Sequence, residues 1–375
     1  MKISRRDFLR MAAYAAAAAG VTEFDLGKLN QALADAGGTG KPPVLWFEGL
    51  GDQGCIVSTA NYFDGVNGIE GVLLNNIELR YNQVLMGAAG QLAIDQSNAV
   101  YNGAPTTPGT VPPSYILILT GAISNLNGYC IIGQDNATQL ELIEYFKMLE
   151  ARAKYVICAG ACACFGGVNR IGGLQYNNDP EALVPNHAGG ASFGGYAVTR
   201  NQNWVPSKSI IIPGCPVHPD WLILTIVHIL TNGSLPLKDG YLRPRYLQLS
   251  PIGGVPNTGP KTYLFQNKTG PASGPSNPLD PLALGTIHEQ CPRKAKHDAG
   301  QFAASVGDDT NCLESVGCRG KETYGDCPTR GWNSTGTNKT GKWCNAPGIN
   351  HLCIGCTQPM FPAVPMNRKI NNIIP

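Results

Sequence analysis

Residues 115–119 read Y-I-L-I-L, a continuous apolar run typical of a strand buried on both faces of a parallel sheet. Four further segments read as strands: V-L-W-F at 44–47, I-E-L-R-Y at 77–81, Y-V-I-C at 155–158 and S-I-I-I at 209–212. Helical patterns alternate with these strands. This alternation predicts a doubly wound α/β fold with a parallel sheet.

Two helices are predicted with defined starts. The first covers about 138–153, where Thr138 and Glu141 form a capping-box pattern ahead of an apolar stripe. The members of the stripe are Leu142, Tyr145, Phe146 and Leu149. The second begins at Pro219, a favourable first-turn residue, and ends before Gly233.

Glycine-rich loops carrying cysteine follow three of the predicted strands. They read E-G-L-G-D-Q-G-C at 48–55, A-G-A-C-A-C-F-G-G at 159–167 and P-G-C-P at 213–216. The carboxyl ends of parallel strands meet at one edge of the sheet, where such folds bind their ligands. Three loops that converge there with thiols indicate a metal cluster, and the alternative is a set of buried structural cysteines.

A second group of cysteines lies between residues 288 and 356, which hold seven of the chain's thirteen. The stretch contains H-E-Q-C at 288–291, Cys312, C-R-G-K-E-T-Y-G-D-C at 318–327, Cys344 and C-I-G-C at 353–356. Thiols crowded into short polar loops have three common uses: disulfides, structural zinc or iron–sulfur clusters. Spacing alone leaves these three uses open.

The order of these motifs resembles the iron–sulfur domain of [NiFe] hydrogenase small subunits, as does the run H-D-A-G-Q-F at 297–302. The resemblance extends over nearly the whole chain. It implies a flavodoxin-like domain at 42–234, followed by a loop-rich iron–sulfur domain at 235–375. It also implies a relay of electrons from H2 oxidation at the nickel–iron centre of a large subunit, through proximal, medial and distal clusters. The acceptor would be a cytochrome or a quinone-linked protein.

The resemblance also implies the ligands of the three clusters. The proximal cluster would use Cys55, Cys162 and Cys215 with either Asp52, a water or nothing in the fourth position, and we expect Asp52. The distal cluster would use His288, Cys291, Cys312 and Cys318. The medial cluster would use Cys327, Cys353 and Cys356, and we expect Cys344 as its fourth ligand. All three are expected to be [4Fe-4S] clusters, with [3Fe-4S] as the alternative for the medial one.

Several positions depart from the family pattern. Asp52 stands where the family's C-x-x-C has its first cysteine, and Cys344 stands about where many relatives have proline. Gly167 occupies the position at which a six-cysteine proximal variant would need a cysteine. Thr120 and Val57 stand where the family often has glutamate, so Glu48 and Asp52 are candidates to replace those carboxylates. No role is assigned to Cys130, Cys158 or Cys164.

The amino terminus resembles a twin-arginine export signal. S-R-R-D-F-L-R at 4–10 precedes an alanine-rich run at 12–20. We expect residues 1–36 to direct export of the folded protein, to the periplasm or the outer face of the cytoplasmic membrane. No apolar run reaches the ~18 residues of a membrane helix.

The composition argues against nucleic acid or an anionic membrane as partner. The formal charge is +2 and only 14% of residues are charged, which suggests that a protein partner covers much of the surface. The alternatives to a hydrogenase small chain are a stand-alone iron–sulfur electron carrier, a quinone-linked complex subunit that shares the proximal domain, and a disulfide-stapled exported protein without iron.

Overall fold

The computed structural model describes residues 41–62, 68–103, 115–124, 128, 130–135, 138–168, 193–194, 208–236, 238, 242–244, 286–331, 344–345, 348–358 and 361. The expected export signal lies outside these residues. The chain forms two compact units, the second of which holds the described residues from Lys238 onward.

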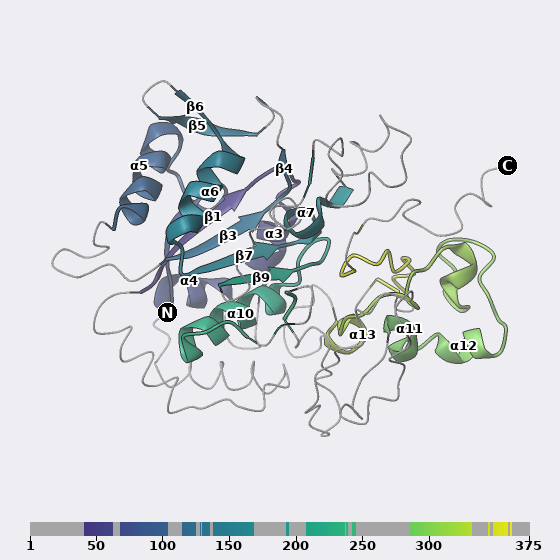
Figure 1. Cartoon of the computed structure of the whole chain (residues 1–375). Helices are drawn as coiled ribbons and strands as arrows, with labels where there is room; N and C mark the ends of the chain where they lie inside the picture. Colours follow the sequence, from purple (N-terminus) through teal and green to yellow (C-terminus); the bar gives the residue numbers. More distant parts are fainter. Residues whose placement is uncertain are drawn as a thin grey trace, which may run out of the picture. The chain divides into compact units, whose positions relative to one another are not determined.

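The first unit is built on a five-stranded parallel sheet (Figure 1). Its strands are β1 (Pro43–Glu48), β2 (Glu78–Asn82), β3 (Ile116–Thr120), β7 (Tyr155–Ala159) and β9 (Ser209–Ile212), in the order β2-β1-β3-β7-β9. Every residue of β1, β3, β7 and β9 is buried. The order is that of flavodoxin-like doubly wound sheets, so the predicted α/β fold is confirmed.

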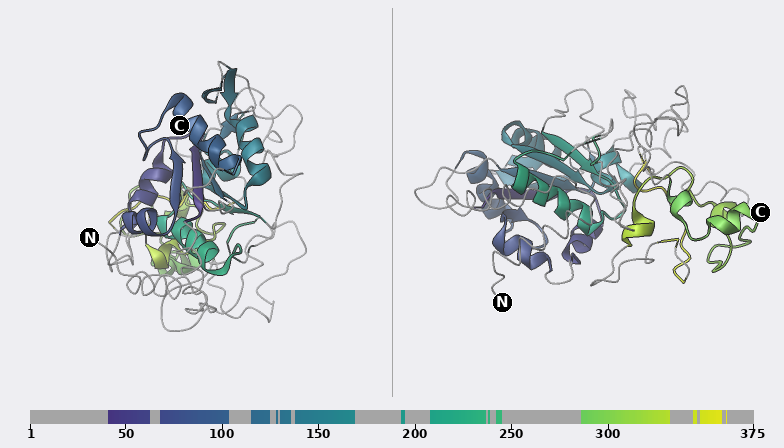
Figure 2. Two further views of the ribbon diagram at one scale, coloured as in Figure 1. Left: turned by 90° about the vertical axis from the view of Figure 1, so that its left-hand side faces the viewer. Right: turned by 90° about the horizontal axis from the view of Figure 1, so that it is seen from below.

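Helices cover both faces of this sheet (Figures 1 and 2). Helices α5 (Gly90–Tyr101) and α6 (Leu142–Arg152) lie on one face, and α4 (Ile69–Asn75) and α10 (Pro219–Asn232) lie on the other. The short helices α3 (Gly54–Ala60) and α7 (Ala161–Phe165) directly follow β1 and β7. Two small antiparallel pairs complete the unit: β4 (Ile123–Ser124) with β8 (Phe193–Gly194), and β5 (Ile131–Asp135) with β6 (Thr138–Glu141).

The predicted start of helix α6 is wrong. Thr138–Glu141 form strand β6, which pairs with β5, and the helix begins only at Leu142. Glu141 keeps an extended backbone and its carboxylate accepts a hydrogen bond from the Gly128 N–H at 2.7 Å, so no capping box forms. Pairing with a neighbouring strand therefore overrode the local capping signal.

The predicted apolar stripe of α6 and the limits of α10 are confirmed. Leu142, Tyr145, Phe146 and Leu149 are all buried, and Phe146 packs edge-on against Phe47 of β1 with ring centroids 6.3 Å apart. Helix α10 begins at Pro219 and is followed by Gly233 in the left-handed conformation (φ +61°).

The described part of the second unit is rich in loops. Its regular elements are α11 (Ile287–Gln290), α12 (Lys294–Asp298), the 3₁₀ helix η4 (Leu313–Val316) and α13 (Cys327–Arg330). A small apolar cluster of Ala303, Leu313, Val316 and Leu352 forms its core. Among the described helices of the whole chain, none combines the length and apolarity needed to cross a membrane.

Candidate metal centres

The four predicted proximal residues come together at the carboxyl edge of the sheet. Asp52 and Cys55 follow β1, Cys162 lies in α7 after β7, and Cys215 follows β9. Electrostatic interactions connect the group: Cys55 interacts with Cys162 and Cys215, Cys162 interacts with Cys215 and Asp52, and Cys215 interacts with Asp52.

Glycine permits the close approach of the proximal loops. Gly160, with φ +88°, lies so near Cys55 that an added Cβ would stand 2.3 Å from its Sγ. Gly167, with φ +56°, lies equally close to Cys162, because an added Cβ would stand 2.4 Å from the Cys162 Sγ. Both positions therefore exclude larger residues on conformational and steric grounds. The cysteine that the six-cysteine family variant would need at position 167 would collide with the Cys162 thiol.

The proximal thiols are shielded from solvent to different degrees. Burial raises the pKa of Cys162 to about 12, and the neighbouring Cys215 adds to that rise. Burial also raises the pKa of Cys55, although the Val217 N–H donates to its Sγ at 3.4 Å. Thiols of this kind become thiolates when a metal replaces their protons. The donor set therefore fits a cationic iron–sulfur core.

The carboxylate of Asp52 lies at the exposed side of this group. Its Oδ1 accepts a hydrogen bond from the Gly54 N–H at 2.9 Å, within the turn that leads into α3. Gln53 between them adopts a left-handed conformation (φ +60°). The exposed residues Asp52 and Cys215 thus face the outside of the first unit.

Glu48, the last residue of β1, places a buried carboxyl group opposite Thr120 of β3. The Thr120 hydroxyl donates to Glu48 Oε2, and it accepts a hydrogen bond from the Trp46 indole at 3.0 Å. Burial raises the pKa of Glu48 to about 7, the Thr120 hydrogen bond opposes the rise, and the charge of Asp52 adds to it. The neighbouring strand thus supplies a carboxyl group beside Thr120, the position at which the family often has glutamate.

The three predicted distal thiols also come together, in the second unit. Cys291 directly follows α11, and Cys312 and Cys318 flank η4. The Asn345 side-chain Nδ2 lies 3.6 Å from both Cys291 Sγ and Cys318 Sγ. Burial raises the pKa of Cys291 to about 11, and the charge of Cys312 adds to the rise.

The H-x-x-C spacing would place His288 and Cys291 on one face of a continuous helix, but α11 ends at Gln290 and Cys291 has an extended backbone. His288 is held by other contacts. Its backbone N–H donates to Gly320 O at 3.0 Å, and the Gly320 N–H donates to Cys318 Sγ at 3.4 Å. A capping box of Thr286 and Glu289 fixes the start of α11.

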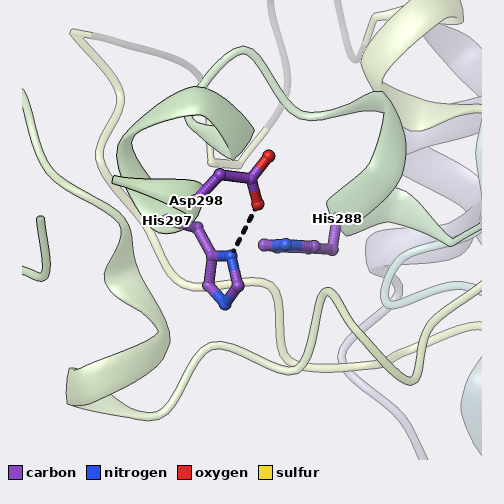
Figure 3. A group of neighbouring side chains, drawn as sticks. All are labelled: His288, His297 and Asp298. Carbon is purple, nitrogen blue, oxygen red and sulfur yellow. Dashed lines mark hydrogen bonds and ion pairs between the residues drawn. The ribbon is translucent and has the colours of Figure 1, made fainter. Parts of the chain in front are cut away.

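The ring of His288 packs against His297, a residue that the sequence did not predict as part of the site (Figure 3). The two ring centroids are 4.5 Å apart and the planes cross at 81°. A ring nitrogen of each histidine and a carboxylate oxygen of Asp298 all lie within 4.8 Å of one another. The run H-D-A-G-Q-F contained the only sequence signal for this contact. Burial lowers the pKa of His288, which favours the neutral ring that binds metals.

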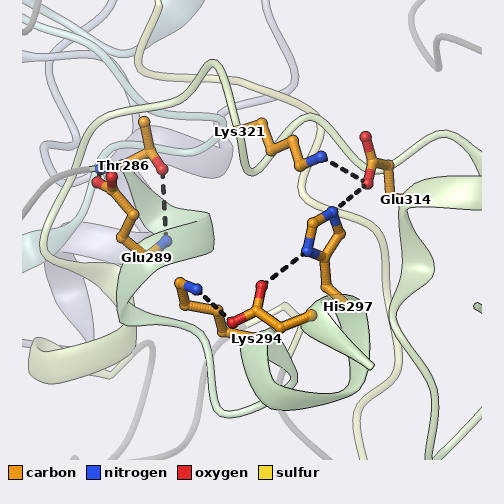
Figure 4. A network of polar contacts seen from close by, with 7 residues as sticks. Thr286, Glu289, Lys294, His297, Glu314 and Lys321 are labelled. Atoms are coloured by element: carbon orange, nitrogen blue, oxygen red, sulfur yellow. Dashed lines mark hydrogen bonds and ion pairs between the residues drawn. The ribbon is translucent and has the colours of Figure 1, made fainter. Parts of the chain in front are cut away.

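Two carboxylates hold the His297 ring (Figure 4). Its Nδ1 lies 3.0 Å from Asp298 Oδ1 and its Nε2 lies 3.1 Å from Glu314 Oε2. Each carboxylate also binds a lysine, Lys294 with Asp298 at 2.5 Å and Lys321 with Glu314 at 2.9 Å. The ring that packs against His288 is therefore anchored at both nitrogens.

The four predicted medial cysteines form a third group. The thiol of Cys344 is hydrogen-bonded to Cys353 and interacts electrostatically with Cys327 and Cys356. The hydrogen bond lowers the pKa of Cys353 and, together with burial, raises that of Cys344. The Thr323 hydroxyl also hydrogen-bonds Cys353. Cys344 thus stands among the other three thiols.

The remaining cysteines lie in the core of the first unit. Cys158 is a fully buried residue of β7, and the Cys164 thiol donates to its carbonyl at 3.3 Å. Cys130 is buried next to β5. All thirteen cysteines fall within the described residues, and each of them is a free thiol. The structure therefore gives no support to the disulfide-stapled alternative.

Two family models match the chain, one in each unit. Residues 53–229 match the family of the NADH ubiquinone oxidoreductase 20 Kd subunit. Residues 285–367 match the family of the C-terminal region of NiFe/NiFeSe hydrogenase small subunits. The second match separates the chain from a quinone-linked protein that has the proximal domain alone.

Curated relatives align over almost the whole chain. The periplasmic [NiFeSe] hydrogenase small subunit of Desulfomicrobium baculatum is 26% identical over 373 residues, which cover 96% of this chain and 97% of the relative. The hydrogenase-2 small chain of Escherichia coli K12 is 28% identical over 368 residues, 95% of this chain and 77% of the relative.

A solved structure shows the same fold. The recombinant [NiFeSe] hydrogenase from Desulfovibrio vulgaris Hildenborough in the oxidised state matches with a TM-score of 0.61 and 25% identity, over 86% of this chain and 95% of that chain. The family matches in both units and the near full-length relatives together identify this chain as the small subunit of a hydrogenase of the [NiFe]/[NiFeSe] type, which transfers electrons through iron–sulfur clusters.

Proposed function

We propose that this protein carries three clusters, held by the three residue groups described above, and passes electrons from the nickel–iron centre of its large subunit to an external acceptor. The observation that carries the proposal is that all ten predicted cysteine ligands fall into three groups of neighbouring thiols. When bound, the clusters supply reversible one-electron redox chemistry. The chain's part is to hold, shield and tune them.

The proximal group is the one we assign to the large-subunit side. Asp52 and Cys215 are exposed at the carboxyl edge of the sheet, and Val57 of the adjacent helix α3 is 55% exposed. An exposed ligand set beside an exposed apolar residue suits a surface that a partner chain covers. The distal group, with His288, is the exit toward a cytochrome or quinone-linked acceptor.

We propose that Asp52 ligates a four-iron proximal cluster. Carboxylate oxygen is a harder ligand than thiolate, but iron accepts it. In Asp52→Ala we expect the three-iron signal of an open cluster in electron paramagnetic resonance (EPR) of the oxidised protein. Asp52→Cys should keep four irons, with a lower proximal potential. A three-iron proximal signal in the unaltered protein would refute this ligand assignment.

For the medial cluster we propose four irons, with Cys344 as the fourth ligand. Its thiol already hydrogen-bonds Cys353 and lies near Cys327 and Cys356. Cys344→Pro would copy the residue that many relatives have there. We expect this variant to gain a medial three-iron signal in the oxidised state. If the unaltered protein shows that signal and the substitution leaves it unchanged, Cys344 is not a ligand.

We further propose export by the twin-arginine route, with residues 1–36 as signal, and domains at 42–234 and 235–375. The relatives named periplasmic support this location. Replacing both Arg5 and Arg6 by lysine should leave a folded, cluster-containing protein in the cytoplasm. Cell fractionation measures this, and normal export of the double variant would contradict the proposal.

The overall assignment is tested by purifying the protein without oxygen from its own host and measuring hydrogen-dependent dye reduction. We expect activity together with a co-purifying, nickel-containing large chain. A brown, iron-rich protein without that chain and without activity would instead identify a stand-alone electron carrier.

A further inference from the structure

Arg293 is a buried cation beside the distal thiols. Its residue is only 3% exposed and stands two positions after Cys291. The guanidinium donates four hydrogen bonds. Its acceptors are Asn345 O at 3.1 Å, Asp308 O at 2.8 Å, Asn311 O at 2.7 Å and Asn350 Oδ1 at 2.6 Å. Every one of these acceptors is an uncharged carbonyl or amide oxygen.

Within the described part of the chain, no carboxylate forms an ion pair with this guanidinium. The charges of Asp308 and Asp309 interact with it at longer range, but Asp309 is exposed and Asp308 is only half-buried. Their oxygens accept hydrogen bonds from the backbone N–H groups of Thr310, Asn311 and Gly348. A buried charge with only neutral partners is costly unless an anion lies nearby.

The anion that this site offers is the group of distal thiols. The backbone N–H of Arg293 donates to Cys291 Sγ at 3.4 Å, and the charge of Arg293 acts on both Cys291 and Cys312. When thiolates hold an iron–sulfur core here, the assembly is anionic, and it becomes more so with each electron it accepts. The guanidinium would then have the counter-charge that the described side chains do not supply by direct contact.

Asn345 adds a second stabilising contact to the same sulfurs. Its Nδ2 carries two hydrogens and lies 3.6 Å from each of two sulfurs, Cys291 Sγ and Cys318 Sγ. Asn345 is buried, and its backbone carbonyl accepts the hydrogen bond from Arg293 Nε. The two residues therefore form one connected group that directs positive charge and N–H dipoles toward the distal thiols.

We propose that Arg293 and Asn345 set the reduction potential of the distal cluster, by stabilising the negative charge that each arriving electron brings. This inference rests on the proposed assignment of Cys291, Cys312 and Cys318 to that cluster. Hydrogen bonds to cluster sulfurs and nearby charge are established means of tuning such potentials. A raised distal potential favours movement of electrons outward from the medial cluster. Both are positioning residues, because neither would ligate iron.

The test is a potentiometric titration of each cluster, followed by EPR, in the complex purified without oxygen. Asn345→Ala removes the N–H groups but keeps the backbone carbonyl that Arg293 uses. We expect it to shift the distal potential downward, with iron content and the other two potentials unchanged. Arg293→Gln should shift the distal potential further down, and Arg293→Lys, which retains the charge, should shift it less.

Thr323→Val is the matched control, since the Thr323 hydroxyl hydrogen-bonds Cys353 of the medial group. It should move the medial potential and leave the distal one in place. Should Arg293→Gln fail to fold, Asn345→Ala decides the question. If the distal potential is unchanged in intact Asn345→Ala protein, the proposed tuning is wrong, but the assignment of the distal cluster still stands. A distal signal that persists in Cys312→Ser would overturn the cluster assignment, and this inference with it.

Discussion

At the scale of single residues, Glu48 is a buried carboxyl group held by neutral partners. Its side chain meets the Thr120 hydroxyl, while its backbone N–H and carbonyl are both bound by the Gln83 side chain. Glycines at 51 and 121 leave room for its Oε1, since an added Cβ would come within 2.5 Å and 3.0 Å of that atom. The surrounding backbone is thus shaped around this carboxyl group.

The raised pKa of Glu48 predicts a pH-dependent stability. The value is about 7 in the folded protein against an ordinary 4.5, so the folded state binds the proton more tightly. The stability that this proton supports is complete below pH 4.5 and is lost as the pH rises through 7. The loss is of the order of 3 kcal/mol.

Glu48→Gln replaces the carboxyl group by a neutral group of the same shape. The unfolding temperature is measured at about pH 5 and at about pH 8, on either side of the folded pKa. We expect the decrease from the lower to the higher pH to be smaller in this variant than in the unaltered protein. Glu144→Gln, on the surface of α6, is the control and should leave the pH dependence as it was. Equal falls in all three proteins would show that Glu48 is not the responsible group.

At the scale of elements, helix α7 depends on the glycine that precedes it. Gly160 is its N-cap, with φ +88°. It offers no side-chain cap, and instead its N–H donates to Ile212 O of β9 at 2.8 Å while the Ala161 N–H donates to Gly214 O at 2.6 Å. These bonds connect the loop that carries Cys162 to the loop that carries Cys215. Because Gly160 has no side chain, Cys55 of the loop after β1 can pack directly against it.

Gly160→Ala should therefore disrupt the proximal cluster. The backbone at Gly160 (φ +88°, ψ 152°) lies in a region used almost only by glycine, which costs another residue of the order of 1–3 kcal/mol. The new Cβ would also displace the Cys55 sulfur. We expect loss of the proximal EPR signal with the distal and medial signals retained. Gly87→Ala is the control, because no atom lies within 4 Å of its added Cβ. A normal proximal EPR signal in Gly160→Ala would show that the added Cβ does not displace the Cys55 sulfur.

Helix α11 is a four-residue element whose order depends on its capping box. The Thr286 hydroxyl accepts from the Glu289 N–H at 3.4 Å, and the Glu289 carboxylate accepts from the Thr286 N–H. Thr286→Ala should cost about 1 kcal/mol and loosen His288. We expect faster loss of the distal EPR signal on mild warming, whereas Thr286→Ser should behave like the unaltered protein. Equal decay rates in the two variants would show that the Thr286 cap does not stabilise the distal cluster.

At the scale of the whole molecule, the two units differ in what holds them together. The first has a sheet with four strands buried along their full length and helices on both faces. In the second, the described buried apolar side chains are few: the cluster of Ala303, Leu313, Val316 and Leu352, with Ile287 and Phe361 also buried. A core that small stabilises a domain poorly without metal ligation or another crosslink.

Removal of iron should therefore unfold the second unit first. After treatment with a chelator and an oxidant, we expect the described backbone N–H groups of residues 286–331 to lose protection from hydrogen exchange, while strands β1, β3 and β7 keep theirs. Limited proteolysis should cut the second unit and leave a fragment containing the sheet. Equal protection in both units after complete iron loss would show that the second unit folds on its own contacts.

Much of this architecture was predictable because its signals are local. Continuous apolar runs such as residues 115–119 are best satisfied in a strand buried on both faces, and loops with glycine and cysteine had to follow those strands. Pro219 and Gly233 marked the ends of α10 by their own backbone preferences. The ligand candidates came from the resemblance of these motifs, in their order and spacing, to those of hydrogenase small subunits.

The contacts that only the tertiary structure decided join residues far apart in the sequence. Thr138–Glu141 became a strand because β5 was there to pair with it, against a local helix signal. Glu48 faces Thr120 across 72 positions, and Asn345 reaches Cys291 across 54. The burial of Arg293 depends on carbonyls from separate loops. Such neighbours leave no periodic or spacing signal, because their positions are set by packing. The sequence by itself therefore determined which ligand-type residues this hydrogenase protein carries, whereas the fold decided which charges and dipoles surround them.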